Sequence, residues 1–220
     1  MHRLLFEKKG NAVWISHLDL MRLFQRAFMR AGIVLTHTQG FNPRPSVSIA
    51  LPLSVGAESH CELLDFEPEN CSFSCEEILC RLNDALVDGV KVLAVYENGK
   101  KLKELALLQC QVRLSYDNGI PEGAAESIRK LFEQDSLMVS KKTKNNGIQQ
   151  QDIIPLIREL SVCQEKDGCI VLNSLICCQN PSLNPMQLVA AVETYLPEYK
   201  PDFAVFTRVE IFDHNVNVFR

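Results

Sequence analysis

The residues best suited to bind a ligand surround the turn Gly-Phe-Asn-Pro-Arg-Pro at 40–45. Gly40 tolerates a positive φ angle, while Pro43 and Pro45 each fix φ and remove a backbone donor. A loop stiffened in this way loses little conformational entropy when it binds. The alternative is a turn that only ends the neighbouring strands. The density of polar groups favours a binding loop, with candidates His37, Gln39, Asn42, Arg44 and Ser46.

A helix is predicted just before this loop, over 17–30, and it carries three arginines on one side. Ser16 and Asp19 have the spacing of a helix N-terminal cap, and Gly32 is placed to end the helix. At 100° per residue the apolar side chains gather on one face, and the arginines lie opposite. Guanidinium groups bind phosphate through two parallel hydrogen bonds, so the arginines are candidate anion ligands; the alternative is a solvated outer face. They are Arg22, Arg26 and Arg30.

The charge distribution agrees with an anionic partner for the N-terminal part. Residues 1–50 contain seven Lys/Arg and two Asp/Glu, whereas residues 51–99 contain two Lys/Arg and ten Asp/Glu. A partner responds to the local field of one face more than to the total charge of −4. A second basic cluster lies in a polar segment, where contact with RNA and simple solvation are equally compatible with the sequence. It consists of Lys141, Lys142 and Lys144.

Three histidines are the candidates for catalysis, namely His17, His37 and His60. A histidine beside arginines can cleave RNA by general acid–base chemistry. The alternative is a histidine at an element end that bonds to the backbone. The sequence has no paired carboxylates, no Ser-His-Asp order and no glycine-rich phosphate loop. We therefore expect the chain not to be an enzyme on its own.

The nine cysteines do not predict a metal site. Cys71, Cys75 and Cys80 have the spacing C-x3-C-x4-C, whereas a radical S-adenosylmethionine (SAM) cluster requires C-x3-C-x2-C, and Ile78 occupies that third position. Two of these cysteines also lie in a predicted helix. With no apolar run long enough to span a membrane and no signal peptide, the chain is expected to be cytoplasmic, with free thiols.

Two tandem ferredoxin-like (β-α-β-β-α-β) units of the α+β class are predicted from the order of strands and helices. The boundaries are 1–98 for the N-terminal unit and 105–220 for the C-terminal unit, with a linker at about 98–104. In the first unit we expect helices at 17–30 and 74–86 and strands at 3–10, 33–38, 46–53, 58–67 and 90–97, with 12–16 extending or pairing with the first strand. In the second we expect helices at 121–134 and 184–196 and strands at 106–116, 136–144, 168–178 and 203–213, with 152–165 ambiguous and an inserted segment near 145–157.

Residues 14–67 resemble the opening of the radical-SAM-associated (radical-SAM-linked) protein family, a bacterial domain family of unassigned function. The resemblance lies in the S-H-x-D-L helix start, the Q-G-F-N-P-x-P turn, the A-L-P-L strand and the V-G-x-E-S segment. It implies that this chain works with a radical SAM protein, and that the iron–sulfur cluster and S-adenosylmethionine belong to that partner and not to this chain. At the level of architecture alone, the paired units also resemble the repeat-associated RNA-binding superfamily.

Three functions remain open at this point. The first is a non-catalytic accessory or substrate-recognition protein that acts with a radical SAM enzyme and binds RNA through the basic residues and the loop. The second is a metal-independent RNA-processing endonuclease that uses one of the three histidines. The third is a protein–protein interaction module that binds no nucleic acid.

Overall fold

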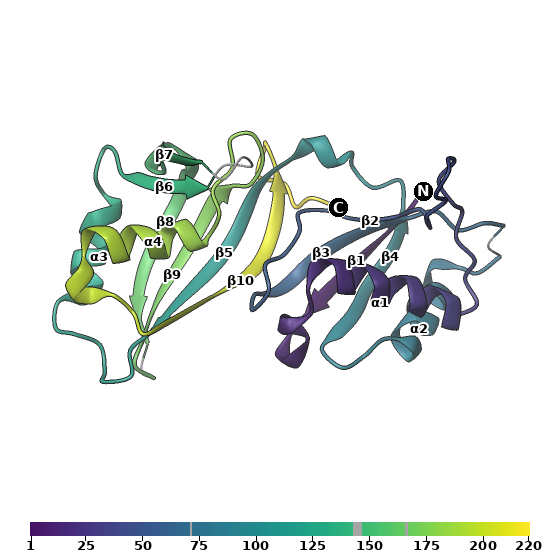
Figure 1. The fold of residues 1–220 in the computed structure, drawn as a ribbon, viewed down its shortest axis with the longest axis horizontal. Coiled ribbons are helices and arrows are strands. Elements are labelled where there is room, and N and C mark those ends of the chain that lie inside the picture. Colours follow the sequence, from purple (N-terminus) through teal and green to yellow (C-terminus); the bar gives the residue numbers. More distant parts are fainter. Residues whose placement is uncertain (71, 143–146, 166) are drawn as a thin grey trace. The chain divides into compact units, whose positions relative to one another are not determined.

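Two β-α-β-β-α-β units follow one another along the chain in the computed structural model, which describes residues 1–70, 72–142, 147–165 and 167–220. Unit 1 comprises Met1–Leu102 together with Arg220, and unit 2 comprises Lys103–Phe219. The protein is therefore of the α+β class (Figure 1). None of the helices in the described ranges is long and apolar enough to cross a membrane.

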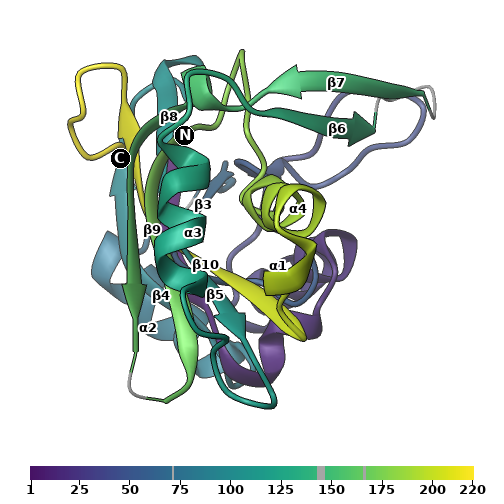
Figure 2. The ribbon, with the colours of Figure 1, turned by 90° about the vertical axis from the view of Figure 1, so that its left-hand side faces the viewer.

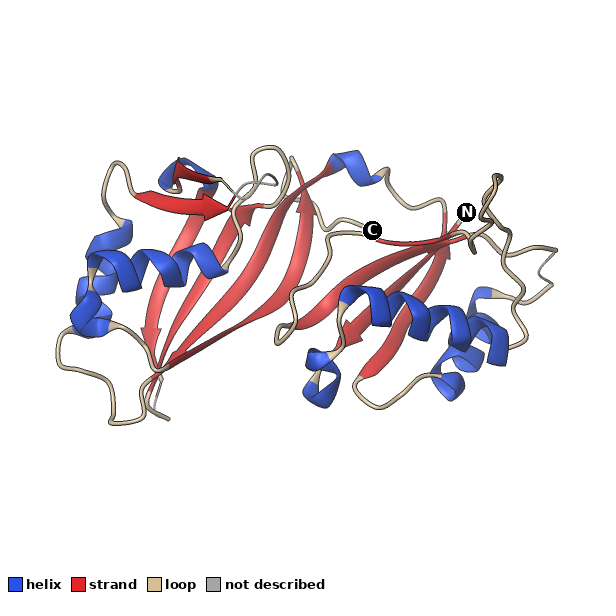
Figure 3. Cartoon of the chain, in the orientation of Figure 1, coloured by secondary structure: helices blue, strands red, loops and turns tan. Residues whose placement is uncertain are grey.

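Unit 1 is a four-stranded antiparallel sheet with two helices. Its strand order, β4-β1-β3-β2, is that of a ferredoxin-like unit. Both helices lie on one face of the sheet (Figure 3). In chain order the elements are β1 (His2–Lys8), the 3-10 helix η1 (Gly10–Trp14), α1 (His17–Arg30), β2 (Val47–Ile49), β3 (Glu58–Phe66), α2 (Cys75–Ala85) and β4 (Val90–Glu97).

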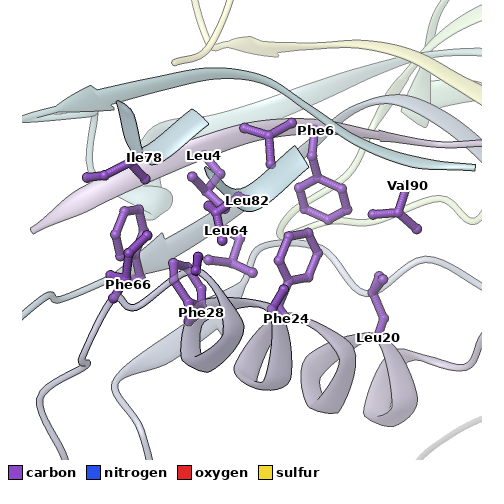
Figure 4. Close-up of a cluster of buried hydrophobic side chains, with 14 of the residues drawn as sticks. Leu4, Phe6, Leu20, Phe24, Phe28, Leu64, Phe66, Ile78, Leu82 and Val90 are labelled. Carbon is purple, nitrogen blue, oxygen red and sulfur yellow. The ribbon is translucent and has the colours of Figure 1, made fainter. Parts of the chain in front are cut away.

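The core of unit 1 lies between this sheet and its helices (Figure 4). Phe24 of α1 packs edge-on against Phe6 of β1, with ring centroids 4.7 Å apart. Phe28, one turn later, lies 4.8 Å from Phe66 of β3. All four rings are fully buried. The helix period of 3.6 thus places consecutive turns of α1 over neighbouring strands.

Both helices of unit 1 begin at a serine cap. Ser16 accepts a hydrogen bond from the backbone of Asp19, as the sequence predicts. Ser74 accepts from Glu77 N at 3.2 Å, and the Glu77 carboxylate accepts from Ser74 N at 2.8 Å. This reciprocal pair is a capping box, which satisfies two backbone donors that the helix leaves open. The predicted helices at 17–30 and 74–86 are confirmed.

Unit 2 has the same strand order, β10-β5-β9-β8, also antiparallel throughout. Helices α3 and α4 lie on one face of this sheet, and a separate hairpin, β6–β7, is inserted between α3 and β8 (Figure 2). In chain order the elements are η2 (Leu102–Glu104), β5 (Leu105–Ser115), α3 (Ala124–Phe132), β6 (Met138–Lys142), β7 (Ile148–Asp152), η3 (Ile154–Leu156), β8 (Ile157–Gln164), β9 (Cys169–Cys177), α4 (Met186–Tyr195), η4 (Pro197–Tyr199) and β10 (Phe203–Asp213).

Two predicted strands of unit 1 are wrong, and a third is shorter than expected. Residues 12–16 belong mostly to η1, and 33–38 form only isolated bridges, at Leu35 and His37. Of 46–53, only Val47–Ile49 form a strand, because Pro45 and Pro52 lack a backbone donor and Leu51 has a positive φ of 48°. The alternating apolar pattern of 33–38 is real, since Ile33 and Leu35 are buried, but these side chains enter the core of unit 1 without forming a strand.

Candidate functional site

A pocket of about 720 Å³ lies beside the C-terminal half of α1 in unit 1. We call it the α1 pocket. Its walls are largely apolar, and its charged or polar lining comes from α1 and from the segment that follows. The apolar lining is made by Phe28, Met29, Ile33, Val34, Leu35 and Pro45. The polar lining side chains are those of Arg22, Gln25, Arg26 and His37.

The pocket exists because the chain reverses direction at Gly32, where α1 ends. Gly32 has φ +71°, a conformation that glycine adopts without strain. Its N–H donates to Met29 O, and the N–H of Ile33 donates to Phe28 O at 2.9 Å. These two bonds are those of a Schellman motif, which satisfies the last carbonyls of a helix. Residues 33–37 consequently return alongside α1 and form the second wall.

The loop that follows this wall is closed by three hydrogen bonds. Thr38 N donates to Arg44 O and Ser46 N donates to Thr36 O, both at 2.8 Å, while Arg44 N donates to Thr38 Oγ1 at 3.1 Å. Ser46 is half-buried at its base. The side chains at the tip are exposed, and they include Gln39, Phe41, Asn42 and Arg44.

The three arginines of α1 have different environments. Arg22 donates to Asp19 Oδ1 at 2.9 Å, so its charge is partly neutralised. Hydrogen bonds from Ser16 and then from Arg22 hold the pKa of the Asp19 carboxyl below its ordinary value. Arg30 donates to Ala85 O at the end of α2 and does not line the pocket. Arg26 is exposed and makes no ion pair or hydrogen bond with any residue the structure describes.

The candidate histidines do not gather in the α1 pocket. His37 lines it, whereas His17 stands at the start of α1 and His60 is exposed on β3. A three-histidine constellation is therefore not present among the pocket's lining residues. One histidine beside two guanidiniums can donate a hydrogen bond to an anion, and it provides only half of an acid–base pair.

The predicted lysine cluster belongs to unit 2. Lys141 lies in β6, and its Nζ donates to Ser182 O at 3.1 Å, so this ammonium is engaged within its own unit. The side chain of Lys142 and the whole of Lys144 lie outside the described residues. The structure therefore brings together Arg22, Arg26 and His37 in unit 1, with the Arg44 loop next to them.

The apolar part of the pocket is not among the residues predicted from the sequence. Met29 is 79% exposed and Val34 61% exposed, although both are large apolar residues. In the sequence, Met29 falls outside the apolar stripe of α1 that becomes buried. A large apolar residue in that position could have indicated an exposed apolar surface. An apolar cavity with cationic groups at its edge suits a ligand that is flat or aliphatic at one end and negatively charged at the other.

A family profile covers most of this chain. The profile of the family described as "uncharacterized protein conserved in bacteria (DUF2344)" matches residues 2–185. No curated protein matches the chain. A crystal structure of an unknown protein from Galdieria sulphuraria is similar at 11% sequence identity, with 94% of this chain and 96% of that chain covered and a TM-score of 0.26.

Proposed function

Because this chain belongs to DUF2344, a bacterial family whose description assigns no activity, we propose its function from the α1 pocket. The protein is a substrate-recognition protein that binds single-stranded RNA and presents it to a radical SAM enzyme. The observation that carries the proposal is one cavity in which apolar walls adjoin Arg22, Arg26 and His37.

The chemistry of the pocket suits an unstacked nucleotide. Proteins that recognise RNA by sequence bind bases that have left the stack, and they place them against apolar, aromatic or guanidinium surfaces. A cavity of about 720 Å³ has room for a base and its ribose. Met29 and Val34 would contact the base, and the Arg26 guanidinium would bind the adjoining phosphate.

The loop at 38–45 extends the same surface toward the next nucleotide. Its backbone bonds fix the base of the loop, and Asn42 and Arg44 project from it into solvent. An amide recognises base edges by paired hydrogen bonds, and a guanidinium binds phosphate. We assign sequence preference to Asn42 and backbone attraction to Arg44.

The partnership with a radical SAM enzyme is proposed from the resemblance of residues 14–67. The two most specific parts of that resemblance, S-H-x-D-L and Q-G-F-N-P-x-P, fall on the start of α1 and on the loop at 38–45. The resemblance thus covers the two elements that flank the pocket. The iron–sulfur cluster and S-adenosylmethionine would be held by the partner polypeptide.

Fluorescence anisotropy with a labelled single-stranded RNA oligonucleotide tests the RNA proposal. We expect the logarithm of affinity to fall with the logarithm of salt, with a slope near −0.7 for each phosphate contact. Arg26→Ala combined with Arg44→Ala should reduce the slope by about 1.4. Arg158→Ala is the matched control, because Arg158 is exposed and lies in unit 2. Salt-independent binding, or equal losses in the control, would contradict the proposal.

A protein-binding function is the second candidate, favoured by the exposure of Met29 and Val34. In that case the pocket would receive an apolar side chain of an acidic segment. Co-purification of a partner from native lysate distinguishes the two functions: a partner retained after nuclease treatment, with no RNA affinity in the anisotropy assay, would replace the RNA proposal. Retention of a radical SAM protein would support the partnership under either function.

The endonuclease alternative is tested by incubating the purified protein with the same oligonucleotide. We expect no cleavage, because His37 lines the pocket without a second acid or base among the other lining residues. Cleavage that is lost in His37→Ala and kept in His60→Ala would show that the protein is an enzyme.

A further inference from the structure

Three side chains that can ligate a metal meet at one end of the unit 1 sheet, in a place that the α1 pocket does not use. They are His2, Cys75 and Glu97, and their ligand atoms all lie within 4.8 Å of one another. His2 Nε2 and Glu97 Oε1 are 3.0 Å apart. A nitrogen, a sulfur and a carboxylate oxygen thus lie close enough together to be ligands of one metal ion.

The backbone places these groups by regular structure. His2 is the first residue of β1 and Glu97 the last residue of β4, and the two are direct partners in the antiparallel ladder. Cys75 is the first residue of α2, whose start is fixed by the capping box of Ser74 and Glu77. Ligands carried on strands and helices are held more accurately than ligands on loops.

The histidine ring is held in place while the carboxylate keeps freedom to adjust. His2 is tilted against Phe66, a core residue, with centroids 5.3 Å apart, and its side chain is 18% exposed. Its Nδ1 is buried and has no hydrogen-bond partner among the described residues. The Glu97 side chain is 58% exposed. A fixed imidazole and an adjustable carboxylate can close around an ion without rearrangement of the sheet.

The donor set and its size select the metal. Zinc takes sulfur, nitrogen and carboxylate ligands in a tetrahedron at roughly 2.0–2.3 Å, so its ligands lie about 3.4 Å from one another. Ligand atoms within 4.8 Å approach that spacing after small side-chain movements. Three protein ligands leave one position open, as in zinc sites that bind water or a substrate group.

We propose that His2, Cys75 and Glu97 form a zinc site with one position open to solvent. The cysteine spacing could not indicate it, because the ligands are brought together by strand pairing and not by a local motif. The site belongs to unit 1 alone, and it is independent of RNA binding in the α1 pocket.

The test uses tag-free, chelator-treated protein titrated with cobalt chloride and then with zinc chloride. We expect one equivalent to bind, with a thiolate-to-cobalt band that zinc removes. Cys75→Ser should abolish the band, because it removes the thiolate. Loss of a residue that only supports a metal ligand lowers metal affinity by roughly tenfold. His2→Gln and Glu97→Gln remove ligands themselves, so they should weaken binding by about tenfold or more. Cys80→Ser is the matched control, since Cys80 is an exposed cysteine of the same helix.

X-ray absorption on the zinc-loaded wild type keeps the test decisive if a variant fails to fold. One sulfur and one imidazole in the coordination shell support the site. The proposal is overturned if no stoichiometric cobalt or zinc binds, if the band survives Cys75→Ser, or if Cys80→Ser removes it equally.

Discussion

The two units share one topology but differ in the connection between their first helix and second strand. In unit 1 this connection, residues 31–46, is irregular and lines the α1 pocket. In unit 2 the corresponding residues include the hairpin β6–β7, which is bonded back to its own unit: Tyr195 Oη donates to Met138 O, and Gln151 Nε2 donates to Ser182 O. The unit 1 connection lines an open pocket, whereas the unit 2 connection is hydrogen-bonded to other residues of its own unit.

Arg26 of unit 1 and two arginines of unit 2 differ in whether they are already bonded. Arg113 of unit 2 bonds to both Glu165 and Asp167, and Arg129 bonds to Glu126. Arg26 of unit 1 has no such partner among the described residues. Unit 1 pairs Arg22 with Asp19 at its surface, and it buries a second pair formed by Arg3, which is only 5% exposed. The comparison indicates that unit 1 uses a buried ion pair for its fold and leaves an exposed guanidinium for a ligand.

Removing the buried pair of unit 1 should have the largest effect. Arg3 donates two hydrogen bonds to Asp65, at 2.5 and 2.9 Å, and the carboxylate is 7% exposed. Asp65→Ala leaves a buried guanidinium without its carboxylate, so we expect the free energy of unfolding to fall by about 3 kcal/mol. Urea denaturation measures it. If the double variant Arg3→Met/Asp65→Leu lost as much as Asp65→Ala, the buried unpaired charge would not be the cause.

Charge reversal compares the unpaired arginine with a paired one. Arg26→Glu places a carboxylate where we expect a phosphate, and RNA affinity should fall by about tenfold or more, equivalent to about 1.4 kcal/mol. Arg129→Glu makes the same change in charge in unit 2 and should leave affinity nearly unchanged. Both are measured by anisotropy at one salt concentration. Equal losses would mean that only net charge matters and that the α1 pocket has no special role.

Gly32→Ala tests the reversal that forms the pocket wall. No atom lies within 4 Å of the added Cβ, so the cost comes from the φ of +71° alone, about 1 kcal/mol. The end of α3 offers a contrast, since Gln134, the residue that follows its C-cap Glu133, is not a glycine and has no positive φ. The midpoint temperature of thermal unfolding should be highest for the wild type, lower for Gly32→Asn and lowest for Gly32→Ala, because asparagine tolerates the left-handed region better than alanine does.

Arg113→Ala should change stability little. The Arg113 ion pairs of unit 2 are partly exposed to solvent, and surface pairs contribute up to about 1 kcal/mol. The loss should shrink as salt rises, because salt screens exposed charges. A large, salt-independent loss measured by urea denaturation would show that this network is structural to the same degree as Arg3 and Asp65.

The smallest effects concern one carboxylate in each unit at acid pH. The backbone N–H of Ser74 lowers the pKa of Glu77 below its ordinary 4.5, and that of Leu137 lowers the pKa of Asp152 below its ordinary 3.8. Because the folded pKa values are depressed, the stabilisation is present at neutral pH and is lost as pH falls through them. Glu77→Gln and Asp152→Asn should each make urea-measured stability less dependent on pH below about 5. An unchanged pH dependence would contradict the role of these bonds.

The sequence predicts the fold of each unit well where local signals agree with packing. Ser16 and Ser74 mark helix starts, and the apolar period of α1 identifies Phe24 and Phe28 as core. The prediction of a strand fails at 33–38, because an irregular segment whose apolar side chains enter the core also produces alternation of buried and exposed residues. The hairpin at β6–β7 is polar on much of its surface and gives little apolar signal.

The candidate site is predictable in part for a similar reason. Residue type alone selects arginines, and it cannot say which are already bonded: Arg22 to Asp19, Arg30 to Ala85, or Arg26 to neither. The His2, Cys75 and Glu97 cluster is invisible in the sequence, because its members are brought together by a ladder register and a helix start. Contacts between residues far apart in the chain require the fold.

Every residue that lines the α1 pocket lies between Arg22 and Pro45. This follows from the reversal at Gly32, which folds one continuous stretch of chain onto itself. A mutation in this stretch can reshape the cavity without disturbing the pairing of β1, β3 and β4. Related proteins could therefore change what they bind by altering a single short segment while they keep the same sheet.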